Sequence, residues 1–267
     1  MSGGSLVSVL MGVYYQSSDT GRLARSVSSI LSQSHRNLEL LICDDGSSPE
    51  AVRLLDQLAG EDGRIRLIRR GGLIPLPVKL NACLSEAAAQ WIARMDDDDH
   101  AHPLRLEKQL NYLNTHPDAA FVGCNVNLIR EGVSVGRRCF PERPRVQDFY
   151  MTQPFIHPTL MFRRSALDAV GGYCEDPSVL LCEDYDLLLR MYAKGLSGAN
   201  LQEILFDYTI PPTAKGKRKM KHRWNEVLTR YRRFRELGVL PQAVPFVIKP
   251  IIIGLLPEWI IRIVKPT

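Results

Sequence analysis

Short apolar runs alternate with helix-like segments along the first half of the chain. Five runs have the length and composition of buried strands, at residues 6–11, 38–43, 65–68, 91–95 and 119–126. Apolar side chains at helical spacing predict four helices between and after them, at residues 22–32, 49–58, 78–89 and 103–114. Strands that alternate with helices form a mostly parallel sheet with right-handed crossovers. The pattern therefore predicts an α/β fold in which ligands bind beyond the carboxyl ends of the strands.

Acidic sequences occur at three places, and this fold would bring the first two to one edge of the sheet. Asp44-Asp45-Gly46 follows the second predicted strand, and four consecutive aspartates, residues 96–99, follow the fourth. Adjacent carboxylates repel one another, so this run predicts a bound cation; a solvated loop or a helix first turn is the alternative. Glu183-Asp184-Tyr185-Asp186 begins a further predicted helix, at residues 185–193, where the helix dipole alone would also favour acidic residues.

The end of the chain differs in composition from the rest. The 267 residues carry a net charge of +5, and basic residues concentrate at 215–235. Residues 239–264 are apolar but contain four prolines, whereas a membrane-spanning helix needs about 20 uninterrupted apolar residues. We expect a domain at residues 1–212 and a basic, helical extension at residues 213–267. The extension is predicted to lie on an anionic membrane, with Trp259 as one anchor; packing on the domain is the alternative.

Other features exclude several classes of protein. The six cysteines are scattered without a CxxC pair, which predicts buried thiols in a reducing compartment. The first residues lack the basic start of a secretory signal, so a cytoplasmic location at the inner face of the membrane is expected. There is no GxGxxG or Walker A sequence, and the basic residues come without a nucleic-acid recognition motif. A nicotinamide site, a P-loop and a nucleic-acid partner are therefore not expected.

Several segments, in their order along residues 5–210, resemble the family 2 glycosyltransferases. They are Val7 to Tyr14, Ser29 to Ser34, Leu41 to Ser48, Arg94 to Asp99, Ile156-His157-Pro158-Thr159, Gly171-Gly172-Tyr173 and Glu183 to Arg190. The resemblance implies the GT-A fold, a Rossmann-like sheet flanked by helices. It also implies a nucleotide-diphosphate sugar as donor, Mn²⁺ or Mg²⁺ as cofactor, and inversion at the anomeric carbon. The expected task is adding a sugar to a glycan or lipid-linked acceptor in cell-surface polysaccharide biosynthesis.

The same resemblance implies roles for residues on the donor side. Asp45 matches the position that hydrogen-bonds uracil, and Asp44 shapes the turn or reaches the nucleoside. Tyr14 matches a position lining the base or ribose; an ordinary half-buried tyrosine is the alternative. Asp98 is the implied metal ligand, and Asp96 contacts ribose or a metal-bound water, since hard oxygen ligands suit Mn²⁺ and Mg²⁺. Many relatives have a small residue where this chain has Asp97, whose role stays open.

Residues on the acceptor side follow in the same way. Asp184 is the implied general base, because an inverting displacement needs a carboxylate to take the proton of the acceptor hydroxyl. Glu183 beside it is placed against the acceptor. His157 either touches the acceptor or a phosphate, or is a structural histidine. The loops at residues 71–77 and 132–144 are expected to set the choice of sugar and acceptor.

Three alternatives bear on the function. Processive relatives carry Gln-x-x-Arg-Trp, but here Arg223-Trp224 is preceded by Met220, which favours transfer of one sugar per visit. A nucleotidyltransferase also uses paired carboxylates, a metal and a parallel sheet, but would normally show a Gly-rich basic phosphate loop near its start. A catalytically inactive nucleotide-sugar-binding protein is the third, and the intact Asp98 and Asp184 argue against it.

Overall fold

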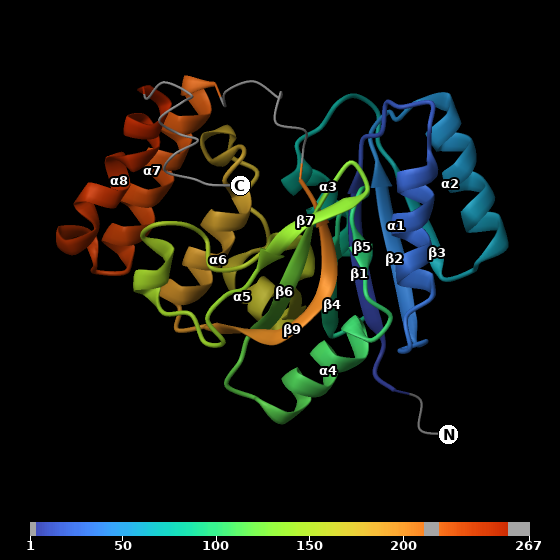
Figure 1. Ribbon diagram of the computed structural model, residues 1–267, viewed down its shortest axis with the longest axis horizontal. Coiled ribbons are helices and arrows are strands. Elements are labelled where there is room, and N and C mark those ends of the chain that lie inside the picture. The colour runs from blue at the N-terminus through green and yellow to red at the C-terminus, as the bar shows by residue number, and fades with distance from the viewer. Residues whose placement is uncertain (1–3, 211–218, 256–267) are drawn as a thin grey trace.

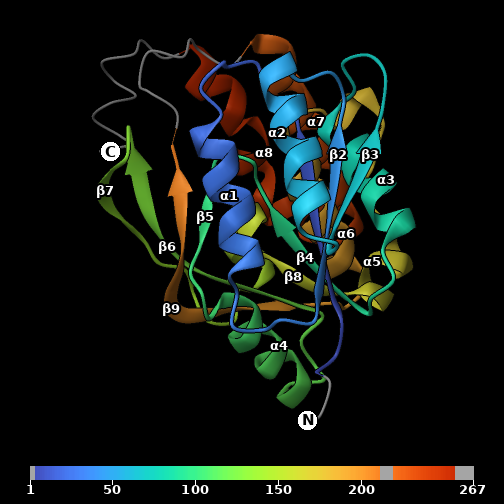
Figure 2. The same ribbon diagram turned by 90° about the vertical axis from the view of Figure 1, so that its right-hand side faces the viewer.

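The computed structural model describes residues 4–210 and 219–255, which contain one mixed sheet covered by helices on both faces (Figures 1 and 2). Its strand order is β3-β2-β1-β4-β8-β6-β9-β5, and β7 pairs with β6 alone. The first four strands in that order are parallel, as predicted. They are β1 (Val7–Val13), β2 (Leu38–Asp44), β3 (Ile65–Arg69) and β4 (Trp91–Met95).

Beyond β4 the sheet is mixed. The short strand β8 runs antiparallel to both β4 and β6, while β6 and β9 run parallel to each other. The loop expected at residues 132–144 is partly a strand, because β7 forms an exposed hairpin with β6. The remaining strands are β5 (His100–Ala101), β6 (Phe121–Arg130), β7 (Val133–Arg138), β8 (Met161–Arg163) and β9 (Gly198–Thr209).

The helices divide the core into two apolar layers. Side chains of α1, α2 and α4 pack on one face of the sheet, and those of α3, α5 and α6 pack on the other. Strand β1 contributes to both layers, with Val9 and Met11 on the first face and Leu10 on the second. The predicted α/β fold class is therefore confirmed. These helices are α1 (Gly21–Leu31), α2 (Pro49–Glu61), α3 (Leu76–Glu86), α4 (Arg105–Thr115), α5 (Arg164–Val170) and α6 (Glu183–Ala193).

A hairpin of two helices, α7 (Met220–Glu236) and α8 (Leu240–Leu255), lies against α6 at one end of the molecule (Figure 1). Its inner face is part of the second apolar layer, where Phe234, Ala243 and Val247 are buried. Instead of short helices, α8 is one helix that continues through Pro245 and Pro250. In residues 4–210 and 219–255 no helix has the length and hydropathy to cross a membrane. The proposed boundary after residue 212, Trp259, and the basic residues between 211 and 218 lie outside the described residues.

Three short 3-10 helices connect these elements. One of them begins at His157, a predicted site residue. They span Val146–Phe149, His157–Thr159 and Pro177–Val179.

Candidate active site

Asp45 lies in a buried polar cluster at the carboxyl end of β2. Its Oδ1 accepts a hydrogen bond from Lys79 Nζ at 2.9 Å, and its Oδ2 accepts one from the Ile74 backbone N–H at 2.7 Å. Lys79, on α3, is itself buried and also donates to the Val13 carbonyl oxygen at 3.2 Å. Its ammonium lies 5.8 Å from the centre of the half-exposed Tyr14 ring. The cluster thus joins a carboxylate acceptor, an amine donor and an aromatic face.

Asp44 points to different partners. Its Oδ1 accepts hydrogen bonds from the backbone N–H and the hydroxyl of Ser47, and its Oδ2 pairs with Arg69 Nη1 at 2.6 Å. These contacts hold the turn at Gly46, whose φ of 112° favours glycine. Asp44 therefore shapes the turn, and a contact with the nucleoside stays a prediction.

Replacing Asp45 by Ala is expected to lower the free energy of unfolding by about 3–5 kcal/mol, because it leaves the ammonium of Lys79 buried without its charge partner. The side chains of Lys79 and Asp45 are 6% and 0% exposed, so water cannot compensate. The double variant Asp45→Ala/Lys79→Met should recover most of this loss, since the buried charge is gone. Urea unfolding measures both effects. An Asp45→Ala protein as stable as the parent would contradict the assigned pair.

A buried guanidinium, that of Arg94, contacts the acidic run after β4. Arg94, 1% exposed, donates a hydrogen bond to Asp96 Oδ1. Burial and the charges of Asp96 and Asp98 raise the pKa of Asp97 to about 7. Asp99 is also buried and accepts a hydrogen bond from the Thr209 N–H at 2.6 Å, while Asp98 is exposed. The same negative charges that favour a proton on Asp97 would favour a cation beside it.

A divalent cation fits the donor set of this run. Carboxylate oxygens of Asp96 and Asp98 are the ligands that Mg²⁺ and Mn²⁺ favour, and the clustered negative charge would stabilise a cation. Among the described residues, no three His, Cys, Asp or Glu side chains converge on one point. A protein site of one or two carboxylates is the pattern typical of Mg²⁺ that also binds substrate phosphates.

Asp184 lies in the first turn of α6. Its Oδ1 accepts a hydrogen bond from the Tyr185 N–H at 2.8 Å, and its Oδ2 accepts one from Gln153 Nε2 at 3.1 Å. Leu181, three residues before it, has a φ of 66°, a left-handed conformation that is costly for a leucine. Such strain is concentrated at functional sites, and here it shapes the entry of the chain into α6.

The side chain of His157 is hydrogen-bonded to Tyr173, which follows a turn formed by two glycines. Its Nε2 lies 2.9 Å from the Tyr173 hydroxyl, and burial together with Arg94 lowers the pKa of His157 well below its usual value. Gly171 and Gly172 have φ of 74° and 69°, which turns the chain sharply before Tyr173. The imidazole is therefore neutral at pH 7, which supports the structural interpretation and leaves contact with a ligand as a prediction.

One cavity of about 340 Å³, here called the Asp96 cavity, brings the two halves of the site together. Asp96, His157, Glu183 and Asp184 all line it. Asp98 lines a neighbouring cavity of about 330 Å³ together with Arg22 and Arg25. The fold thus places the end of β4 opposite the start of α6, although these two segments lie far apart in the sequence.

Comparison with known proteins places the chain in a family. The family described as Glycosyl transferase family 2 matches residues 8–171, and the group described as Glycosyl transferase family group 2 matches residues 91–263. The putative glycosyltransferase EpsE of Bacillus subtilis is 35% identical over 263 residues, covering 98% of this chain and 94% of EpsE. The chain belongs to the family 2 glycosyltransferases.

Two further likenesses agree with this membership. The O-antigen biosynthesis glycosyltransferase WbnJ of Escherichia coli is 33% identical over 190 residues, which cover 69% of this chain and 73% of WbnJ. Among solved structures, residues 1–349 of S. aureus TarS in complex with UDP-GlcNAc superpose with a TM-score of 0.71 at 13% identity, covering 91% of this chain and 72% of that TarS chain. The likeness to TarS shows the fold alone, which is the GT-A fold predicted from the sequence.

Three residues that the structure places beside the candidate site residues were not predicted from the sequence. Lys79 could have been found, because it lies three residues after Leu76 and four before Cys83, on the buried side of α3. Gln153 contacts Asp184, and Arg138 of β7 lines the Asp96 cavity. Neither has a local signal, since each reaches the site only through the packing of distant segments.

Proposed function

We propose that the protein is an inverting glycosyltransferase. It transfers a sugar from a uridine diphosphate sugar to a hydroxyl of a glycan or lipid-linked acceptor in cell-surface polysaccharide biosynthesis. The observation that carries the proposal is the Asp96 cavity, in which Asp184 faces the acidic end of β4. Family membership and the likeness to EpsE and WbnJ support the reaction class, and TarS bound to UDP-GlcNAc supports the donor class.

The nucleoside would be recognised by the residues at the end of β2. Asp45 and Lys79 are buried, with the Ile74 N–H and the Lys79 ammonium on the two Asp45 oxygens, so the proposal requires the segment containing Ile74 to move aside when the donor binds. Asp45 would then accept from a uracil N–H, and Lys79 would donate to a uracil carbonyl. The exposed ring of Tyr14 offers a face for stacking. A base with the same donor and acceptor order, such as thymine, would fit equally well.

The chemical step rests on Asp184. Its carboxylate takes the proton of the acceptor hydroxyl as the bond from that oxygen to the anomeric carbon forms. The bond from the anomeric carbon to the diphosphate breaks in the same step, and the electron pair leaves with the nucleoside diphosphate. Gln153 and the Tyr185 N–H hold the carboxylate in place.

Mn²⁺ or Mg²⁺ would be held by Asp98 and Asp96. When bound, the cation would supply positive charge that stabilises the departing diphosphate. Arg94 beneath Asp96 keeps that carboxylate oriented. The absence of Gln from the Gln-x-x-Arg-Trp position supports transfer of one sugar per visit.

A panel of nucleotide sugars in Mn²⁺ tests the proposal. A donor at a hundred times its dissociation constant should stabilise the protein by about 2.7 kcal/mol. Incubation of the donor that binds with candidate acceptors should then release a nucleoside diphosphate and a glycosylated product. Release of pyrophosphate from a nucleoside triphosphate would instead identify a nucleotidyltransferase, and donor binding without any turnover would identify an inactive binding protein.

The outer face of the α7–α8 hairpin supports a peripheral membrane location at the cytoplasmic face. Four apolar residues spaced three or four apart are exposed along α8: Val244, Ile248, Ile252 and Leu255. Trp224, Leu228 and Tyr231 are exposed at similar spacing along α7. An exposed apolar stripe on a basic helix pair is typical of helices that lie in a membrane interface.

The double variant Ile248→Glu/Ile252→Glu is expected to lose at least about tenfold of the affinity for anionic vesicles, because burying one such side chain contributes about 1.5–3 kcal/mol. These exposed positions are preferable to deletion of the tail, which would uncover the buried Phe234. Leu73→Glu, at an exposed site outside the hairpin, is the matched control. Vesicle co-sedimentation measures the effect, and a parent protein that does not bind at low salt would refute the proposed location.

A further inference from the structure

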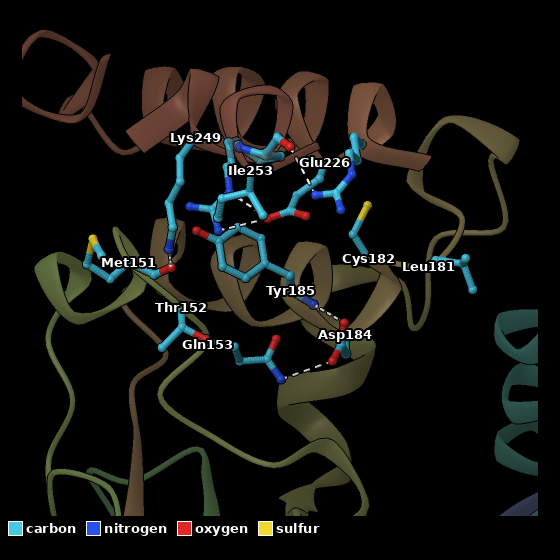
Figure 3. A pocket seen from close by; sticks show the side chains of 13 residues that line it. Met151, Thr152, Gln153, Leu181, Cys182, Asp184, Tyr185, Glu226, Lys249 and Ile253 are labelled. Carbon is cyan, nitrogen blue, oxygen red and sulfur yellow. Dashed lines mark hydrogen bonds and ion pairs between the residues drawn. The ribbon is translucent and has the colours of Figure 1, made fainter. Parts of the chain in front are cut away.

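A third cavity is also lined by Asp184. It has a volume of about 440 Å³ and lies between α6 and the α7–α8 hairpin; we call it the hairpin cavity (Figure 3). Thr152, Gln153, Leu181 and Asp184 line both this cavity and the Asp96 cavity. Asp184, the proposed general base, therefore lines two cavities, and only the Asp96 cavity is also lined by an acidic residue assigned to the donor, Asp96.

Among the described residues that line the hairpin cavity, basic side chains outnumber acidic ones. Arg230 Nη2 and Glu226 Oε1 form an ion pair at 2.9 Å, and the Arg230 guanidinium also lies 4.7 Å from the Tyr185 ring. This pair belongs to the wall, where its two charges offset each other. Arg223 and Lys249 contribute two further positive charges to the lining, against the one negative charge of Asp184. The balance of the lining residues favours an anion over a cation.

Arg223 and Lys249 come from the two helices of the hairpin. Arg223 Nη1 donates to the Pro250 carbonyl oxygen at 3.0 Å, and Lys249 donates to the Met151 carbonyl oxygen. Figure 3 shows Lys249 reaching from α8 toward Met151, while Asp184 and Gln153 face each other on the opposite side. These bonds orient the two cationic side chains in the wall of the cavity.

Gly254 of α8 leaves space for the side chain of Arg223. A Cβ on Gly254 would lie 2.5 Å from Arg223 Cδ, so the bare backbone of α8 leaves the room in which the arginine crosses between the helices. The guanidinium is thereby directed along the cavity wall.

We propose that the hairpin cavity binds the acceptor, and that Arg223 and Lys249 bind an anionic group of it while its hydroxyl meets Asp184. This inference rests on the proposed function, since it needs Asp184 to be the base. A phosphate or carboxylate would bind well to two cationic side chains on one cavity wall, because hydrogen bonds between charged groups are stronger than those between neutral groups. The anion is either the diphosphate of a lipid-linked glycan or the carboxylate of an acidic glycan.

Binding of two anionic probes tests the inference without knowledge of the sugar. Farnesyl diphosphate represents the lipid-linked source and trigalacturonate the acidic-glycan source; farnesol and maltotriose are their neutral counterparts. Titration calorimetry in EDTA keeps divalent cations from attracting the diphosphate to the acidic run. We expect one anionic probe to bind at least about tenfold more tightly than its neutral counterpart, and the probe that binds identifies the source.

Charge-removing variants locate the binding. Arg223→Gln and Lys249→Gln should each lower the affinity for the anionic probe about tenfold, because one charge-assisted hydrogen bond typically contributes that much to binding. Lys221→Gln removes the same charge from an exposed position of α7 outside the cavity and should have no effect. Equal binding by all variants, or an equal loss in Lys221→Gln, would overturn the inference. Binding of UDP in Mn²⁺, measured separately on each variant, reports folding and the proposed function independently.

Discussion

Replacing Asp184 by Asn is expected to lower kcat for sugar transfer by about 10²- to 10⁴-fold, the usual contribution of a general base. Asparagine keeps the shape and can still accept the hydrogen bond from the Tyr185 N–H, but it cannot take the proton of the acceptor hydroxyl. Binding of UDP in Mn²⁺ should be unchanged, because the proposed nucleoside and cation sites lie at the ends of β2 and β4. Steady-state kinetics beside equilibrium binding separates the two quantities.

Asp186→Asn is the matched control on the same helix. Asp186 is buried and pairs with Arg190 and Arg233, both at 2.7 Å, which ties α6 to α7. Its replacement should lower the free energy of unfolding while the folded protein keeps its kcat. A kcat for Asp184→Asn close to that of the parent would refute the assignment of the base. NMR of the product tests the same mechanism, since one displacement must invert the anomeric carbon.

Replacing Asp98 by Ala is expected to abolish Mn²⁺-dependent binding of UDP and to reduce transfer by about 10³-fold or more, because a bound cation is worth several kcal/mol of charge stabilisation. Asp98 is exposed at the end of the acidic run, so its removal leaves the buried contacts of the fold intact. Calorimetric titration of UDP with and without Mn²⁺ measures the binding directly.

Asp99→Asn is the control next to it. The Asp99 carboxylate accepts a hydrogen bond from the Thr209 N–H, and asparagine can preserve this bond through its own oxygen. The variant should therefore retain Mn²⁺-dependent binding of UDP. Parent activity that survives complete chelation with EDTA would show that the cation is not required.

The strands of the first half and the acidic residues at their ends were predictable because they depend on neighbouring residues. A run of apolar side chains, an Asp-Gly turn and a helix start are local patterns, and the direction of a parallel strand then places Asp45 and Asp96 on one edge. The antiparallel strand β8 has three residues, too few to show a pattern, and was not predicted.

The sequence alone therefore determined the fold class and the order of the motifs, and it predicted the acidic residues of the candidate site. Tertiary structure decided the partners of those residues: Lys79 for Asp45, Gln153 for Asp184, and Arg223 and Lys249 in the cavity that Asp184 also lines. It also decided that α8 buries one face and exposes an apolar stripe on the other. The physical reason is that a charge pair or a cavity depends on which distant segments pack together, and no local pattern of residues encodes that contact.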